Sequence, residues 1–517
     1  MNNPLNVIIS SAASGWGTRF IGVIVSLVTL PLIMAHLGKI QYGIWILVGQ
    51  VIQFMSLTDL GVTNAIGRFL SRFRVQGDRE GINQLVTSVA AVLICLALIL
   101  VLGTVFCSPW IPILLNVENE YADVTRMVFI ISGVSIALLF PVRMGQGILF
   151  GYQRYSIPNV AHILGSLLNL SGIVLLVSLD KLQVVNFALV SSISLIFGQI
   201  INIVFAFKTI RPISIKIHNF SLPILKEVFS LGSSTLTVTA SAKLYRQGIA
   251  ITVGLFAGTA AVGVYGVILT LMTHVSFLLT QISRPMMTLA SEFQATDRIG
   301  KLCQLNNFVM KISFALGLCV VGGIFFYGEA FLRLLLSNSD WTDIDFHKSG
   351  IALTIMSAGL AVGIPQMAGR SIMQGVGQHW SVAKRFFIAS IISLLVGITL
   401  MIFDFGIIAA AIGWSLIFVL QGVWLYPRLV CHFLGQNITK MIYESYLPGG
   451  AIGLLVVLAA WFFSTLMPPS GFMEFTIGVA ICVITGLIGI LMIEICNGNF
   501  IGFQALKNKY RTIFLKG

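Results

Sequence analysis

Apolar runs of about 20 residues follow one another along the whole chain and are separated by short polar segments. A run of this length crosses the roughly 30 Å hydrocarbon core of a bilayer as one α-helix. No stretch is left for a sizeable soluble domain. The pattern predicts fourteen transmembrane helices, approximately at residues 12–35, 42–62, 85–107, 124–147, 157–178, 184–207, 229–256, 260–284, 306–327, 350–370, 382–403, 407–427, 447–467 and 474–495.

The composition agrees with this pattern. Of the 517 residues, 57% are hydrophobic and only 9% are charged, and the mean hydropathy is +0.96. These values lie far from those of soluble domains, so we predict an all-α, polytopic (multi-pass) membrane protein. The first ten residues lack the basic region of a secretory signal, and the first apolar run is expected to be retained as a helix.

The charge of the chain is divided between the two sides of the predicted membrane. The net charge is +13, and with both termini on one side most Lys and Arg fall in the loops of that side. The opposite loops carry acidic groups, among them Asp340, Asp343 and Asp345. By the positive-inside rule, the basic side and both termini are cytoplasmic. The charge therefore signals topology and anionic lipids, and we expect no nucleic-acid partner.

Three short motifs recur in the second half of the chain with nearly constant spacing between the two copies. Each match alone is weak, but three in the same order indicate an internal repeat, a common feature of transporters. The motifs are Asp-Arg-Glu-Gly at 78–81 and Asp-Arg-Ile-Gly at 297–300, P-x3-G-x2-I-x2-G from Pro141 and from Pro365, and Gly38-x3-Tyr42-Gly43 and Gly258-x3-Val262-Gly263.

The repeat unit contains six predicted helices. We predict two six-helix halves, at residues 1–220 and 221–430, followed by two additional helices and a basic cytoplasmic tail at 431–517. Because six is an even number, both halves have the same orientation and are related by a pseudo-two-fold axis along the membrane normal. A cavity between them near the midplane would suit transport by alternating access.

Two cations lie inside the seventh predicted helix. Lys243 falls near its middle, and Arg246, three residues on, shares its face. A cation at the bilayer centre costs about 2.5 to 3.5 kcal/mol on insertion scales, and such residues usually face a bundle interior or an aqueous cavity. The first helix carries Arg19, which the repeat aligns with residues 238–243. We therefore predict a substrate-binding site for an anionic group at Lys243, Arg246 and Arg19.

A second interpretation of these cations is structural ion pairing. Asp59, near the inner end of the second helix, is the candidate partner, and it is also a candidate for ion coupling. The other acidic residues of the spans, Glu474 and Glu494, lie at the two ends of the last helix. This excess of positive charge favours a pathway for an anion, but the ion pair with Asp59 stays open.

Further polar residues of the spans have simpler explanations. Arg143, Arg284 and Arg370 lie near cytoplasmic helix ends, where snorkelling to lipid phosphate is expected, and Lys311 is expected at the interface. His274, mid-span in the eighth helix, either titrates or only forms a hydrogen bond. The side chains that suit sugar contacts and helix–helix hydrogen bonds equally well are Gln50, Gln53, Asn169, Gln199 and Asn202.

No motif points to catalysis. The sequence contains neither a G-x-x-x-x-G-K-[ST] phosphate loop nor an H-E-x-x-H metal motif. The seven cysteines occur singly, without C-x-x-C spacing, so each is expected to be a small buried hydrophobe. We predict that the protein is not an enzyme, binds no metal and needs no cofactor.

Three stretches resemble a known family. They are residues 57–73 (LTDLGVTNAIGRFLSRF), residues 77–83 (GDREGIN) and the turn at 147–153 (GILFGYQ). They are similar to those of the polysaccharide-biosynthesis flippases, the O-antigen and capsule transporters of the multidrug/oligosaccharidyl-lipid/polysaccharide exporter superfamily. The length, the number of spans and the six-plus-six-plus-two layout resemble that family over the full chain.

The resemblance implies a function and its setting. The substrate would be an oligosaccharide on a polyprenyl diphosphate, moved from the cytoplasmic to the periplasmic leaflet of a bacterial inner membrane. A cationic cavity between the halves would hold the diphosphate. The implied partners are the lipid-linked oligosaccharide, the bilayer, and the glycosyltransferases and polysaccharide polymerase of the same pathway.

Three other functions compete with this one. A drug or cation antiporter of the same superfamily would share the fold but calls for buried carboxylates. A peptidoglycan-precursor flippase is chemically closer and can also have fourteen helices. A membrane-embedded glycosyltransferase or ligase would need acidic catalytic groups and usually large external loops, whereas the longest predicted external loop here, about residues 328–349, is short.

Overall fold

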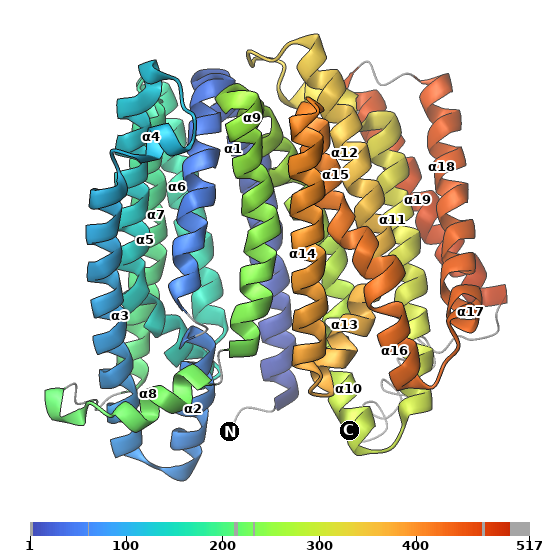
Figure 1. Cartoon of the computed structure of the whole chain (residues 1–517). Coiled ribbons are helices and arrows are strands. Elements are labelled where there is room, and N and C mark those ends of the chain that lie inside the picture. Colours follow the sequence, from blue (N-terminus) through green and yellow to red (C-terminus); the bar gives the residue numbers. More distant parts are fainter. Residues whose placement is uncertain are drawn as a thin grey trace. The chain divides into compact units, whose positions relative to one another are not determined.

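The apolar runs form helices because a chain in hydrocarbon must satisfy its backbone N–H and C=O groups within each segment. The computed structural model describes residues 4–59, 62–210, 213, 216–230, 233–467 and 471–496. Every regular element within these ranges is helical (Figure 1). In chain order the elements are α1 (Pro4–Met55), η1 (Ser56–Asp59), α2 (Val62–Gln76), α3 (Arg79–Cys107), α4 (Ile111–Leu114), η2 (Asn119–Tyr121), α5 (Ala122–Gly151), α6 (Ser156–Ser178), α7 (Val184–Thr209), η3 (Ile217–Asn219), α8 (Leu222–Ser230), α9 (Ser233–Thr280), η4 (Gln281–Ser283), α10 (Pro285–Ala295), α11 (Ile299–Leu335), α12 (Asp343–Gly363), α13 (Gln366–Gly375), α14 (His379–Ile402), α15 (Gly406–Val419), η5 (Leu420–Leu425), α16 (Pro427–Leu434), α17 (Ile438–Met441), η6 (Ile442–Tyr446), α18 (Leu447–Leu466) and α19 (Phe472–Cys496).

Ten helices of the described ranges are long and apolar enough to cross a membrane, or eleven if α12 and α13, which meet at 48°, count as one span. The all-α membrane fold is thus confirmed, whereas fourteen spans are not. Two of the ten helices, Gly17–Met55 and Thr237–Ala295, each take in residues of two predicted spans, and a non-helical glycine, Gly38 or Gly258, lies between the two spans in each case. Their lengths of 39 and 59 residues exceed the roughly 20 that one crossing requires. The last predicted span coincides with a shorter apolar segment, Met473–Gly486.

The chain divides into two compact units. Unit 1 contains residues 1–271, 336–345 and 379–414, and unit 2 contains residues 272–335, 346–378 and 415–517. The contacts described below lie within one unit or the other. The predicted halves at 1–220 and 221–430 are defined by repetition rather than by compactness, and they stay a prediction.

The helices α1 and α9 are each interrupted at one glycine. Gly38 in α1 has φ 66° and ψ 178°, and Gly258 in α9 has φ 81° and ψ 174°. This backbone region is open essentially to glycine alone, so the interruption is written into the sequence at both places. The two glycines begin the two copies of one predicted motif. The ribbons of α1 (blue) and α9 (green) each change direction near the top of Figure 1.

The second glycine of each motif copy lets the two kinked helices meet backbone to backbone within unit 1. A Cβ added to Gly43 would lie 1.9 Å from the carbonyl oxygen of Thr259, next to the kink of α9. A Cβ added to Gly263 would lie 2.0 Å from the carbonyl oxygen of Lys39, next to the kink of α1. The contact is therefore reciprocal, as expected for two copies of one motif that face each other.

A second pair of matched contacts lies inside the two units. In unit 1, the hydroxyl of Ser71 donates to the carbonyl of Gly151 at 3.0 Å. In unit 2, the hydroxyl of Ser291 donates to the carbonyl of Gly375 at 2.6 Å. The two serines are separated by the repeat spacing, and the two glycines are the last residues of the motif copies that begin at Pro141 and Pro365. Each unit thus repeats a local contact of the other.

Two acidic residues, Asp340 and Asp345, bind Lys39 at the kink of α1 and form a clasp. Asp340 accepts hydrogen bonds from the backbone N–H of Lys39 with both carboxylate oxygens, each at 3.1 Å. The Lys39 ammonium lies 2.9 Å from Asp345, which also accepts from the backbone N–H of Thr342 at 3.0 Å and so caps α12. This clasp has no equal at Gly258, where nothing lies within 4 Å of an added Cβ.

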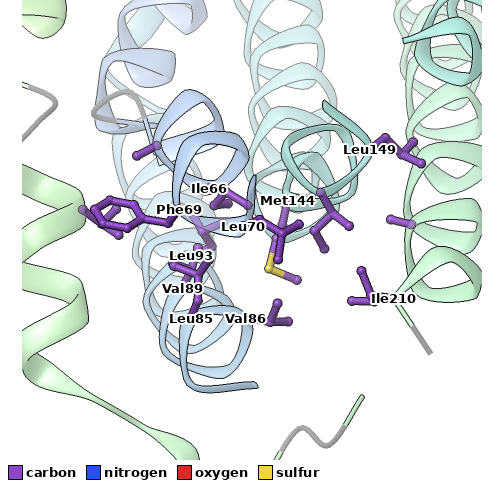
Figure 2. Packing of buried hydrophobic residues seen from close by; sticks show 14 of the residues in the cluster. Ile66, Phe69, Leu70, Leu85, Val86, Val89, Leu93, Met144, Leu149 and Ile210 are labelled. Carbon is purple, nitrogen blue, oxygen red and sulfur yellow. The ribbon is translucent and has the colours of Figure 1, made fainter. Parts of the chain in front are cut away.

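One buried apolar cluster of unit 1 lies where α2, α3, α5, the end of α7 and α8 meet. Apolar residues of α2 recur every three or four positions, as in Ile66, Phe69, Leu70 and Phe73, and so form one buried stripe. Figure 2 shows this stripe gathered with side chains of α3 and α5, including Met144. The cluster determines which face of α5 is buried. Residues of α5 that directly precede or follow a cluster member in the sequence therefore lie on other faces of the helix.

Unit 2 is built around α11, which packs against α18 and α19. Gly453 of α18 leaves room for Leu318, since an added Cβ would lie 2.4 Å from that side chain. Asn307 of α11 donates to Glu444 of η6 at 2.6 Å, and Gln366 donates to the hydroxyl of Tyr446 at 3.2 Å. Apolar packing and buried polar contacts therefore both hold the C-terminal helices on α11.

The backbone contact of Gly43 predicts a strong effect of a single methyl group. We expect Gly43→Ala to lower the stability of the protein by about 3 kcal/mol, because the new Cβ would overlap a carbonyl that cannot move alone. The matched control is Gly49→Ala on the same helix, where nothing lies within 4 Å of the added atom. Thermal unfolding in detergent measures both, and equal melting temperatures for the two variants would contradict the prediction.

The clasp predicts a smaller effect. Asp340→Ala leaves the backbone N–H of Lys39 without its acceptor, and we expect a loss of about 1 kcal/mol, since the carboxylate is exposed. The control is Glu118→Ala, an exposed acidic residue that makes no side-chain cap hydrogen bond. The melting temperature should fall in the first variant and not in the second. The clasp would be dispensable if both variants unfolded at the wild-type temperature.

Candidate functional site

The three predicted site cations all lie in unit 1, on the two kinked helices. Arg19 lies on α1 before the kink at Gly38, and Lys243 lies on α9 before the kink at Gly258. Along the sequence, Arg19 lies roughly one helical turn farther from the kink at Gly38 than Lys243 lies from the kink at Gly258. Lys243 and Arg246 are half-buried and Arg19 is exposed.

The helix α9 carries Lys243 on the side that faces α1. Opposite this side, the ring of Tyr245 lies edge-on to Phe386 of α14, with centroids 6.2 Å apart. On the α1 side, Gly254 leaves room for Leu47, whose side chain would lie 2.5 Å from an added Cβ. Lys243 precedes Gly254 by about three turns and so lies on the same face.

The ammonium of Lys243 is held by the end of α1. Its Nζ donates to the main-chain carbonyl of Gln53, to the hydroxyl of Ser56, and to Gln53 Oε1 at 3.3 Å. An ammonium has three donors, and here each has an acceptor. All three acceptors are neutral, and among the described side chains no carboxylate is paired with this lysine.

Two further positive charges act on Lys243, those of Arg143 and Arg246. The sequence assigned Arg143 to lipid snorkelling because it lies near a predicted helix end. In the structure it is half-buried on α5 and follows Pro141, while the next residue, Met144, belongs to the apolar cluster. Its charge thus acts on Lys243, and its assignment to lipid snorkelling stays a prediction.

Arg19 has a different neighbour. Its charge acts on His162 of α6, a residue that the sequence analysis did not single out. The ring of His162 is exposed, and its Nδ1 lies 3.5 Å from the hydroxyl of Ser166 one turn later. The charges of Arg143 and Arg246 therefore act on Lys243, whereas the charge of Arg19 acts on a histidine.

The remaining predicted residues lie elsewhere. The backbone of Asp59 ends η1, which begins at Ser56, but the side chain of Asp59 is outside the described residues. His274 lies on the part of α9 that belongs to unit 2 and is half-buried. Lys311, expected at the interface, is only 8% exposed and lies over the ring of Phe308, with Nζ 5.3 Å from the centroid. The expectation of an interfacial Lys311 is thus wrong for its side chain, because packing in unit 2 buries it.

The charges that meet near the end of α1 suit an anion. The hydrogen-bond acceptors of Lys243 are dipoles, and the charges of Arg143 and Arg246 act on it. Guanidinium and ammonium groups bind phosphate oxygens through charge-assisted hydrogen bonds. Within the described ranges, no group of three or more His, Cys, Asp or Glu side chains is arranged to hold a metal ion.

Two curated proteins are similar in sequence, and no family model matches the chain. The "Uncharacterized membrane protein EpsK" of Bacillus subtilis (strain 168) is 22% identical over 309 residues, which cover 59% of this chain and 61% of that protein. The "Putative O-antigen transporter" of Salmonella typhi is 20% identical over 445 residues, which cover 82% of this chain and 95% of that protein. The chain thus spans less than two thirds of the first relative and nearly all of the second.

Solved structures share the fold. The lipid II flippase MurJ, in an inward closed conformation, matches with a TM-score of 0.72 and 14% identity over 94% of this chain and 99% of that one. A multidrug resistance MATE family transporter of the MOP superfamily, in an inward-facing conformation, matches with a TM-score of 0.68 and 15% identity over 81% and 95%. At these identities the likeness establishes the fold alone.

The resemblance predicted from the sequence is confirmed by these proteins. One relative is named as an O-antigen transporter, and the structural neighbours are a flippase and a transporter of the superfamily in which the sequence placed the chain. None of the four is named as an enzyme. The chain is therefore a multi-pass membrane protein whose fold is shared by a flippase and a transporter.

Proposed function

We propose that this chain is a flippase for a polyprenyl-diphosphate-linked oligosaccharide, such as an O-antigen repeat unit. It moves the lipid-linked sugar from the cytoplasmic to the periplasmic leaflet by alternating access. The diphosphate is held by a cationic central cavity, in which Lys243, Arg246 and Arg19 contact the substrate. Asp59 and His274 stay candidates for ion coupling or ion pairing.

The observation that carries the proposal is that the three described hydrogen-bond acceptors of Lys243 are neutral. Its ammonium is satisfied by a carbonyl, an amide oxygen and a hydroxyl, while the charges of Arg143 and Arg246 add to its own. A structural ion pair would neutralise the positive charge of Lys243. A binding site for a transported anion must instead keep that charge available to the substrate. A diphosphate fits this charge, and its long prenyl tail can stay in the lipid.

The matched contacts support two repeated halves at 1–220 and 221–430, with 431–517 appended. The kinks at Gly38 and Gly258 have the same conformation, and the hydroxyls of Ser71 and Ser291 donate to equivalent glycine carbonyls. Repeats of one orientation are the usual basis for rocking of two halves around a site near the midplane.

The cellular setting belongs to the same proposal. The membrane is a bacterial inner membrane, and both termini are cytoplasmic, as the distribution of basic loops predicts. Glycosyltransferases supply the lipid-linked substrate on the cytoplasmic side, and a polysaccharide polymerase consumes it on the other. No cofactor is required.

A second candidate is a flippase for a peptidoglycan precursor. The TM-score of 0.72 to a lipid II flippase favours it, and a prenyl diphosphate would meet the same cations. A drug or cation antiporter, the third candidate, has the fold of the MATE neighbour, but the Lys243 ammonium at the end of α1 would repel a cationic substrate.

Transfer between leaflets tests the proposal. We expect the reconstituted protein to move a polyprenyl-diphosphate oligosaccharide across vesicle membranes, and Lys243→Gln with Arg246→Gln to slow this at least about tenfold by removing two phosphate partners. The control is Arg298→Gln with Lys301→Gln, an exposed pair of cations with the same spacing. Its rate should equal that of the wild type.

The outcomes separate the candidates. Transfer of lipid II but not of the oligosaccharide would favour the peptidoglycan precursor. No transfer of either lipid by a folded wild-type protein would refute the flippase function. Wild-type rates in the Lys243 and Arg246 double variant would leave the function in place and refute this site.

A further inference from the structure

We infer that Gln53 and Ser56 are positioning residues: the end of α1 forms a neutral cradle that aims the Lys243 ammonium at the anionic group of the substrate and keeps its charge uncancelled. The inference rests on the proposed function and deepens it. It assigns a role to Gln53, which the sequence could only rank among several polar side chains, and to Ser56, which the sequence did not single out.

The geometry of the cradle comes from a helix end. α1 stops at Met55, so the carbonyls of its last turn lack the partners that a continuing α-helix would give them. The Gln53 carbonyl accepts from Lys243 Nζ and also from the Ser56 hydroxyl, the latter at 2.9 Å. The amide oxygen of Gln53 closes the third side at 3.3 Å from Nζ.

The chemistry of the acceptors determines what the cradle can do. Carbonyl and hydroxyl dipoles stabilise an ammonium, and the C-terminal end of a helix carries a partial negative charge that adds to this effect. None of them carries a full charge, so the positive field of Lys243 still extends to a ligand. A carboxylate in the same place would hold the lysine equally well and cancel that field.

The cradle also offsets two costs. The like charges of Arg143 and Arg246 act on Lys243, and without acceptors the ammonium would turn away from them. A free lysine side chain has four rotatable bonds, and fixing it costs conformational entropy at the moment of binding. With the cradle in place, this ordering precedes the ligand, which is the general benefit of preorganisation.

The cradle is open to a ligand. Gln53 is exposed and Lys243 is half-buried, so the ammonium is not sealed inside packed side chains. The two helices are held in register by the close approach of Leu47 to Gly254, about three turns from Lys243. The position of the cradle therefore does not depend on the hydrogen bonds of the cradle itself.

Gln53→Glu tests the inference because it changes charge with little change of shape. The new carboxylate should pair with Lys243, so melting temperature should stay equal or rise. Binding of farnesyl diphosphate, a short prenyl diphosphate, should weaken about tenfold in detergent, and transfer of the lipid-linked oligosaccharide should slow by a similar factor. Binding of uncharged farnesol should not change.

A matched control adds the same charge elsewhere on the helix. Gln41 lies on α1 roughly 18 Å along the helix axis from Gln53 and accepts a hydrogen bond from the backbone N–H of Val184 at 3.3 Å. Glutamate keeps that acceptor, so Gln41→Glu should leave farnesyl diphosphate binding unchanged. Gln53→Leu with Ser56→Ala, which frees two of the three donors without adding charge, should weaken the binding about threefold.

The results separate this inference from the proposed function. Unchanged farnesyl diphosphate binding in both Gln53→Glu and the Gln53→Leu, Ser56→Ala variant would overturn the cradle, and it is the result expected if Asp59 already compensates Lys243. Loss of farnesyl diphosphate binding in Gln41→Glu as well would also overturn the cradle, because a negative charge anywhere on α1 would then have the same effect. If the wild type binds the diphosphate but moves no lipid-linked sugar, the cradle stands and the flippase function falls.

Discussion

The backbone contact between two kinked helices is the constraint on which the rest of unit 1 depends. Gly43 and Gly263 each admit a carbonyl of the opposite helix, and this fixes α1 and α9 in a single antiparallel register. Only in that register does the end of α1 bring Gln53 and Ser56 to Lys243. These two glycines therefore determine the position of Lys243, the residue on which the proposed site depends. Because they prevent α1 and α9 from sliding along each other, Lys243 stays beside the end of α1.

The environment of this lysine shows how a chain can keep a charge inside a membrane. Pairing with an opposite charge is the usual solution, but it removes the field that a ligand would feel. Here the ammonium is surrounded by oxygen dipoles of a helix end, and its charge is stabilised rather than cancelled. Since surroundings of low dielectric constant strengthen electrostatic attraction, such a group suits a ligand that must be attracted in one state and released in another.

Hydropathy predicted the helical membrane fold and singled out Lys243 as a cation within an apolar run, because both depend on composition along the chain. The breaks that it placed after residues 35 and 256 contain the kink glycines Gly38 and Gly258, but a glycine in an apolar run marks a break without giving its geometry. It also misassigned Lys311. Hydropathy gives the depth of a residue in the membrane but not the direction in which it points, and direction decides whether a cation meets lipid, another charge or a packed core.

The clasp on α1 links distant parts of the chain in time as well as in space. The backbone N–H of Lys39 finds its acceptor in Asp340, which lies 301 residues later. Chains are made and inserted from the N-terminus, so this bond cannot form while the earlier helices enter the membrane. The start of the protein therefore reaches its final form only after nearly two thirds of the 517 residues have been synthesised.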